Sequence, residues 1–98
     1  MYARVVTTVL SEGENDASAE VFERILPAVK ELAGFKGMLI LSELDGRQIV
    51  SLTLWETLEA LDGATAAMNK VRDAESAFRN VDEQETARFR VSGWELVA

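Results

Sequence analysis

The sequence predicts an α+β fold of ferredoxin-like βαββαβ order, with two helices on one face of a four-stranded antiparallel sheet. Two observations lead to this prediction. Two segments with apolar residues at helical spacing each lie between segments rich in β-branched residues, and an Asp-Gly pair joins the two middle strands. The length of 98 residues is that of a single domain, so one unit over residues 1–98 is expected.

The first strand and the first helix are expected before Gly34. Residues 2–10 are rich in β-branched side chains and contain neither Gly nor Pro, which favours a strand. Residues 16–33 carry apolar side chains at helical spacing, and Pro27 is expected to kink or split this helix. Gly34 stands where a helix C-terminal glycine is expected.

A β-hairpin follows. Residues 36–43 and 47–55 read as its two strands, and Asp45-Gly46 is typical of a two-residue turn between them.

A second helix and a last strand complete the order. Thr57 can cap the helix, whose apolar stripe runs to Phe78 and predicts an end near Arg79. Residues 80–85 are polar and read as a connection, and residues 86–97 read as the last strand.

Alternation divides the predicted sheet into two faces. Val50, Leu52 and Leu54 form a wholly apolar face, which we expect under the helices, whereas the opposite face is mixed and carries two tryptophans. Contiguous exposed apolar patches usually mark an interface, so a second copy is expected to cover the mixed face. The alternative is that the tryptophans lie near sheet edges and are half exposed. The residues expected on this dimer face are Ile49, Trp55, Arg88, Arg90 and Trp94.

Composition excludes several classes of function. The chain has no cysteine and no histidine, so it has no disulfide, thiolate nucleophile, imidazole metal ligand or Ser-His-Asp triad, and we expect no metal site. Its net charge of -7 argues against binding to nucleic acid or an anionic membrane surface. No apolar segment approaches the roughly 20 residues that span a bilayer. With no signal-peptide pattern, a cytoplasmic location is expected.

Three short motifs stand in order along the chain. They are a G-F-x-G turn at residues 34–37, a hairpin signal at Asp45-Gly46, and a strand that ends in Trp55-Glu56 and opens the second helix. Together with the βαββαβ order, they resemble the antibiotic biosynthesis monooxygenase family, a branch of the dimeric α+β barrel proteins. The resemblance implies a homodimer whose two sheets form a barrel. It also implies a pocket in each subunit between helices and sheet.

The family that the chain resembles has several functions. It includes cofactor-free oxygenases of aromatic polyketides and quinols, haem-degrading enzymes, and members without a known activity. The haem-degrading branch needs a helix-borne histidine and a tryptophan on the second helix. This chain has no histidine, and its second helix has no tryptophan, which disfavours haem degradation.

The resemblance also suggests candidate site residues. Trp55 matches the strand-ending tryptophan, whose role is catalytic or structural. Asn69 on the second helix could polarise a substrate oxygen, or it could be a solvated helix position. The residues expected to line the pocket are Phe22, Leu26, Leu39, Leu54, Met68 and Phe89.

Arginines form a second candidate feature. Arg88 and Arg90 are two apart in a strand and share a face, and with Arg4 they could form a cationic strip. Such a strip could be an anion or enolate site inside the dimer barrel. It could equally form ion pairs across the dimer with Glu43 or Glu95.

Two hypotheses about function remain. In the first, the protein is a small cofactor-independent monooxygenase of an aromatic or quinol substrate, and the substrate itself supplies electrons to dioxygen. In the second, it is a non-catalytic dimer that binds a small ligand or serves a structural role, and the predicted pocket residues are ordinary core.

Overall fold

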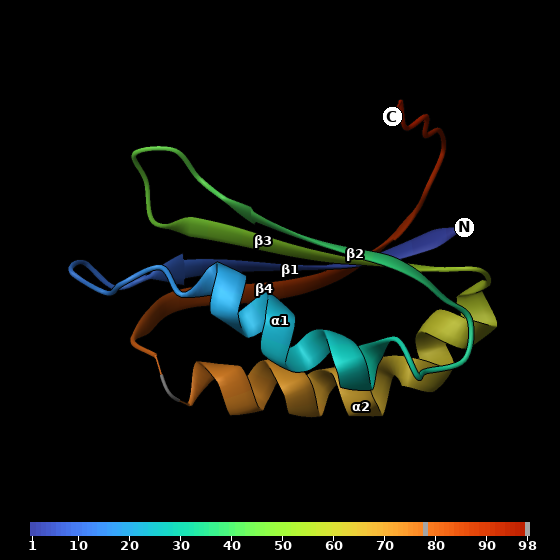
Figure 1. The fold of residues 1–98 in the computed structure, drawn as a ribbon, viewed down its shortest axis with the longest axis horizontal. Coiled ribbons are helices and arrows are strands. Elements are labelled where there is room, and N and C mark those ends of the chain that lie inside the picture. The colour runs from blue at the N-terminus through green and yellow to red at the C-terminus, as the bar shows by residue number, and fades with distance from the viewer. Residues whose placement is uncertain (78, 98) are drawn as a thin grey trace.

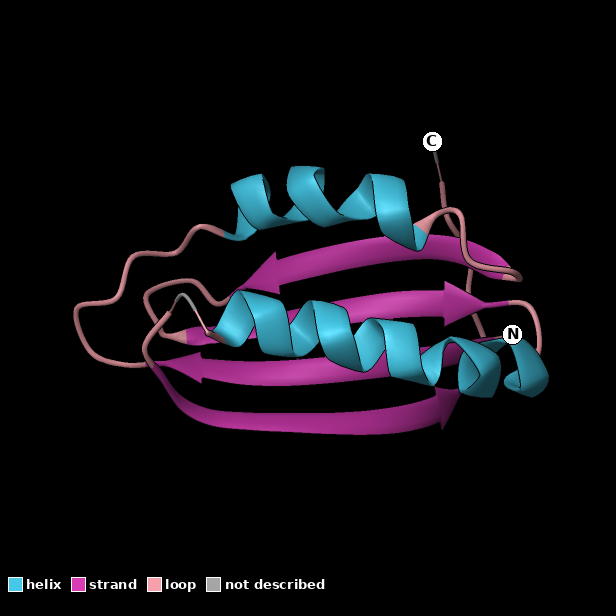
Figure 2. Ribbon diagram, turned by 90° about the horizontal axis from the view of Figure 1, so that it is seen from below, coloured by secondary structure: helices cyan, strands magenta, loops and turns pink. Residues whose placement is uncertain are grey.

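The computed structural model describes residues 1–77 and 79–97, so the predicted Phe78 lies outside the described residues. The predicted βαββαβ order is confirmed. Both helices lie across one face of the sheet (Figures 1 and 2). The elements are β1 (Tyr2–Leu10), α1 (Ser18–Val29), β2 (Phe35–Ser42), β3 (Gln48–Trp55), α2 (Leu58–Ser76) and β4 (Val81–Arg90).

The four strands form one antiparallel sheet of order β2-β3-β1-β4. β1 is an inner strand that pairs with β3 on one side and with the edge strand β4 on the other, so the first and last strands of the chain are neighbours. Neither helix of the described residues is long and apolar enough to cross a membrane.

The helix ends follow local chemistry. α1 continues through Pro27 and ends at Val29, four residues before the predicted end. α2 begins after Thr57, whose Oγ1 accepts a hydrogen bond from the Ala60 N–H at 3.0 Å. This bond satisfies one of the unpaired amides of the first turn, as the N-cap prediction requires.

Gly34 allows the chain to turn from α1 into β2. Its φ is +79°, and a Cβ at this position would collide with the Cβ of Ala60 on α2. We therefore expect Gly34→Ala to lower the free energy of unfolding by about 1–3 kcal/mol. The matched control is Gly63→Ala within α2, where a Cβ meets nothing, and we expect it to raise this free energy by about 0.5–1 kcal/mol. Urea unfolding of both variants measures the difference, and an unchanged stability of Gly34→Ala would contradict this role.

Two predicted connections are wrong. The β2–β3 loop is longer than a two-residue turn: the Glu43 N–H bonds to the Gln48 carbonyl at 2.9 Å, and the positive φ of 56° is at Asp45. The last strand begins at Val81 and ends at Arg90, so the predicted polar connection is strand. Pairing with β1 outweighs the low β-propensity of its acidic residues, which are well tolerated on an exposed edge strand.

The sheet faces are the reverse of the prediction. Trp55 is fully buried and packs with Val29, Leu61, Ala64 and Met68, so it lies under the helices. Because side chains alternate along a strand, the whole face that carries Trp55 is the one that the helices cover. Ile49 is on this face and is also buried.

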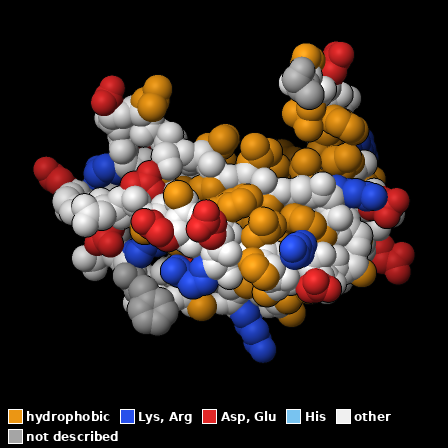
Figure 3. Space-filling model, in the orientation of Figure 1, with side chains coloured by type: hydrophobic (Ala, Val, Ile, Leu, Met, Phe, Trp, Pro, Cys, Tyr) orange, Lys and Arg blue, Asp and Glu red, His pale blue; other side chains and the backbone are white. Residues whose placement is uncertain are grey.

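The face away from the helices is apolar. The register aligns Leu52 with Leu39 on one side and with Val5 on the other. Ala3 lies between Leu54 on β3 and Phe89 on β4. Leu39 and Phe89 are about half exposed, at 50% and 53%. In Figure 3 apolar side chains gather along the upper surface and on the projecting C-terminal segment. We call this face the open face; its apolar residues are Ala3, Val5, Val9, Leu39, Leu41, Val50, Leu52, Leu54, Ala87 and Phe89, and its polar residues include Thr7, Glu83 and Glu85.

Candidate functional site

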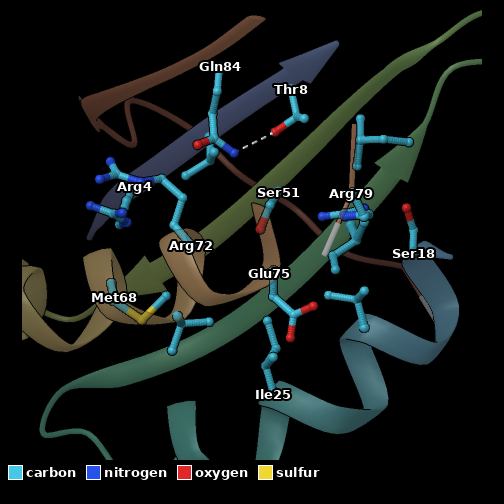
Figure 4. A pocket seen from close by; sticks show the side chains of 15 residues that line it. Arg4, Thr8, Ser18, Ile25, Ser51, Met68, Arg72, Glu75, Arg79 and Gln84 are labelled. Carbon is cyan, nitrogen blue, oxygen red and sulfur yellow. Dashed lines mark hydrogen bonds between the residues drawn. The ribbon is translucent and has the colours of Figure 1, made fainter. Parts of the chain in front are cut away.

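A cavity lies between the helices and the sheet, over the face that carries Ile49 and Ser51 (Figure 4). It has a volume of about 60 Å³ and is partly open to solvent. The sheet contributes mostly polar side chains to it, and the helices contribute both apolar and charged ones. The lining residues are Arg4, Val6, Thr8, Ser18, Val21, Ile25, Ile40, Ile49, Ser51, Met68, Val71, Arg72, Glu75, Arg79 and Gln84.

Of the six residues predicted to line a pocket, Met68 alone lies in this lining. α1 contributes Val21 and Ile25 in place of Phe22 and Leu26, each one position earlier. A shift of one residue turns a helix by about 100°, which is enough to change the side chain that faces the sheet.

The other three predicted lining residues lie on the open face. Leu54 aligns with Ala3, and Phe89 with the same residue from the other side, whereas Leu39 is half exposed on β2. Their placement follows from the reversal of the two sheet faces, because a strand residue moves with its whole face.

Arg4 is the most buried charged group of the cavity, at 5% exposure. Within residues 1–77 and 79–97, its side chain makes one hydrogen bond to protein, from Nη2 to Asn69 Oδ1 at 3.0 Å, and no ion pair. Burial lowers the pKa of the Arg4 guanidinium from its ordinary value, and the positive charge of Arg72 lowers it further, while Asp73 opposes this shift. An arginine remains charged despite such a shift.

Asn69 is half-buried on α2 and lies within hydrogen-bond distance of Arg4. Its amide oxygen accepts the hydrogen bond from Arg4 and fixes the orientation of that guanidinium. The acceptor of this bond is an uncharged amide, so the bond itself brings no negative charge to Arg4.

The other charged groups of the cavity differ in how they are paired. Glu75 on α2 forms an ion pair with Arg24 on α1, so its charge is balanced. Arg72 donates to Thr86 at 3.0 Å and contacts Asp73. Figure 4 shows Arg4 and Arg72 together at one end of the cavity, which we call the cationic end.

Polar side chains link the sheet to α2 next to the cationic end. Gln84 on β4 donates to Thr8 on β1 at 3.2 Å and to Ser76 on α2 at 2.9 Å. These bonds hold the polar wall in place, because buried polar groups that bond to each other restrain the elements that carry them.

Trp55 is not among the residues that line the cavity. Its Nε1 donates to Thr53 Oγ1 at 3.0 Å, and its ring packs edge-on against Phe35 with centroids 5.7 Å apart. At 0% exposure, with its one N–H already bonded, the side chain has the environment of a core residue.

The remaining residues expected on a dimer face lie elsewhere. Arg88 forms an ion pair with Asp62 on α2, so its side chain reaches the helix layer. Arg90 lies two residues further along β4, opposite Tyr2, so alternation places it on the same face of the sheet as Arg88. Trp94 follows β4 outside any strand and is 65% exposed. Arg4 and Arg88 do lie opposite each other in register, as the predicted strip requires, but they make separate contacts.

The sequence analysis missed the cationic end on α2. Met68, Arg72 and Glu75 follow one another at intervals of four and three, so they share one face of the helix. The apolar stripe thus continues as a charged stripe towards the C-terminus. A search for charged residues at the spacing of the apolar stripe would have found these side chains.

Among residues 1–77 and 79–97, no three His, Cys, Asp or Glu side chains are grouped as metal ligands. The cavity presents guanidinium, hydroxyl and amide groups, which bind oxygen atoms of organic ligands.

No protein-family model and no curated protein matches this sequence. Solved structures match its fold along almost the whole chain. A monooxygenase from the gene ActVA-Orf6 of Streptomyces coelicolor, in complex with nanaomycin D, has a TM-score of 0.70 and 20% identity over 99% of this chain and 92% of that one.

Two further structures have the same fold. SnoaB, a cofactor-independent oxygenase from Streptomyces nogalater, has a TM-score of 0.70 and 21% identity over 95% of this chain and 94% of its own. A protein from Deinococcus radiodurans, described as a proposed antibiotic biosynthesis monooxygenase, has a TM-score of 0.74 and 16% identity over 100% and 99%. The expected resemblance to antibiotic biosynthesis monooxygenases is thus confirmed for the fold.

Proposed function

We propose that this protein is a cofactor-independent monooxygenase that oxidises an aromatic or quinol substrate in the cavity between the helices and the sheet. The observation that supports this most directly is the composition of the cavity. Ile25, Ile49 and Met68 provide an apolar wall, and Arg4 and Arg72 provide a cationic end. The fold shared with a monooxygenase that binds nanaomycin D and with SnoaB, a cofactor-independent oxygenase, adds support by analogy.

The reaction needs only the substrate and dioxygen. With 1-naphthol as the example, the ring carbon opposite the hydroxyl gains one oxygen atom and becomes a carbonyl. The hydroxyl proton and the ring hydrogen leave with the second oxygen atom as water, and the product is a naphthoquinone. The substrate supplies all the electrons. Negative charge that develops on the ring is stabilised by the fixed guanidinium groups of the cationic end.

The cavity is small for an aromatic substrate. At about 60 Å³ it is smaller than the roughly 300–1,000 Å³ of typical small-molecule pockets. A two-ring substrate therefore requires side chains at the cavity to move apart. Met68 is suited to this, because its unbranched side chain repacks easily. A cavity that stays closed would favour the second hypothesis, a dimer without catalysis.

The proposed active form is a homodimer. The open face carries ten apolar residues in register, and Leu41 and Phe89 are more than half exposed, at 52% and 53%. Exposed apolar surface of this kind is normally covered by a partner, and a second copy offers the same flat apolar surface. This dimer uses the face opposite to the one that the sequence predicted.

Oxygen consumption tests the proposed function. We expect the protein to consume oxygen with members of a panel of naphthols and anthrones, without any added cofactor or metal, and to form the quinone in equal amount. Heat-denatured protein is the control for spontaneous oxidation. The same rate with native and denatured protein across the panel would contradict catalysis and favour the non-catalytic dimer.

A further inference from the structure

Arg4 carries a buried positive charge that has no ion-pair partner in the described part of the chain. Its side chain is 5% exposed and its bonding partner, Asn69, is neutral. Among the described residues, four other arginines form ion pairs with acids: Arg24 with Glu75, Arg47 with Asp82, Arg72 with Asp73, and Arg88 with Asp62. A buried charge without a counter-charge destabilises a fold by several kcal/mol, so a bound anion would be strongly favoured there.

The groups around Arg4 fit an anion rather than a cation. Arg72 also lines the cavity on the same side, and its charge acts directly on Arg4. The one acid in the lining, Glu75, pairs with Arg24. Asp73, whose charge also acts on Arg4, is mostly exposed and pairs with Arg72. The remaining polar groups nearest this end on the sheet, Thr8 and Gln84, are neutral.

We propose that Arg4 binds a carboxylate of the substrate, so that the ligands of this cavity are aromatic acids rather than neutral phenols. A carboxylate is charged at neutral pH, whereas a simple phenol is not, and its planar oxygens match the fork of a guanidinium. Asn69 is the positioning residue, because it holds Nη2 and leaves the rest of the fork to the ligand. This inference rests on the proposed function, because it names the substrate class of the same cavity.

Calorimetric titration with 2-naphthoate and 2-naphthol tests the inference. The two probes share their rings and differ in the carboxylate. We expect 2-naphthoate to bind at least about tenfold more tightly, the effect of one charge-assisted hydrogen bond. Equal affinities, or tighter binding of 2-naphthol, would overturn the inference.

Two variants locate the effect at Arg4. Arg4→Gln removes the charge, and we expect the preference for 2-naphthoate to fall to less than about twofold. Asn69→Asp places a carboxylate 3.0 Å from the guanidinium in the protein itself, so it should compete with 2-naphthoate, weaken its binding by about tenfold and raise the midpoint of thermal unfolding. This second variant keeps the test decisive if Arg4→Gln does not fold. A preference that survives in Asn69→Asp would overturn the inference.

Arg88→Gln is the matched control. It also removes one positive charge, but from a side chain that lies outside the cavity lining and pairs with Asp62. We expect its affinity for 2-naphthoate to stay within about twofold of the unchanged protein; an equal loss in Arg88→Gln and Arg4→Gln would show general electrostatics and overturn the assignment to Arg4. Binding does not require turnover. Selective binding without oxygen consumption therefore leaves this inference standing and contradicts the proposed function, and oxidation of phenols without selective binding does the reverse.

Discussion

Replacement of Trp55 by alanine is expected to lower the free energy of unfolding by about 3–5 kcal/mol, the usual cost of removing a large buried aromatic side chain. The ring is fully buried beneath the helices, packs edge-on against Phe35 and belongs to the cluster that contains Leu61 and Met68. Its loss also leaves Thr53 Oγ1 without its donor. Urea unfolding at a fixed protein concentration measures the change.

The matched control is Trp94→Ala. This second tryptophan is 65% exposed and lies beyond the last strand, so its removal from the folded chain should change the same free energy by less than about 0.5 kcal/mol. The sequence alone suggested that both tryptophans share one exposed face. Similar losses for the two variants would contradict the placement of Trp55 under the helices.

Leu52→Glu is expected to convert the proposed dimer to a monomer. Leu52 lies at the centre of the open face, between Leu39 and Val5 in register. A two-fold interface would bury two added carboxylates, each at a cost of several kcal/mol, so the dissociation constant should rise by roughly a thousandfold or more. Sedimentation velocity at micromolar concentration measures the change in mass.

Ala66→Glu is the control for the added charge. Ala66 is exposed on α2, in the layer away from the open face, and this variant should remain dimeric. A monomeric unchanged protein at these concentrations would contradict the proposed dimer. A Leu52→Glu variant that stays dimeric would place the interface elsewhere.

The order of elements could be predicted from the sequence, because it depends on local patterns. The helical spacing and the Thr57 cap each act within a few residues, and the structure confirms them. Gly34 has the positive φ of a turn glycine but follows the C-cap Lys30 by four residues, so its predicted place at the end of the helix is wrong. The start of β4 at Val81 could not be predicted in this way. Its acidic residues have low β-propensity, and they form a strand because β1, distant in sequence, offers unpaired backbone groups.

The orientation of the sheet could not be predicted either. Alternation shows that Leu52 and Trp55 lie on opposite faces, but it does not show which face the helices cover. The prediction placed the wholly apolar face under the helices. In the structure the helices cover the mixed face, where Trp55 fills the core at one end and Arg4 lines the cavity further along β1. The cavity residues were missed for this reason, since Ser51 and Arg4 belong to the face that was expected to meet a partner.

Incorporation of labelled dioxygen tests the central proposal most directly. The protein is incubated with 1-hydroxy-2-naphthoate under ¹⁸O₂, the product is reduced at once to prevent exchange with water, and its mass is measured. The proposed monooxygenase predicts one labelled oxygen atom in each product molecule, and none when the label is supplied as water. A product without label, or label found only in hydrogen peroxide, would contradict oxygen insertion by this protein.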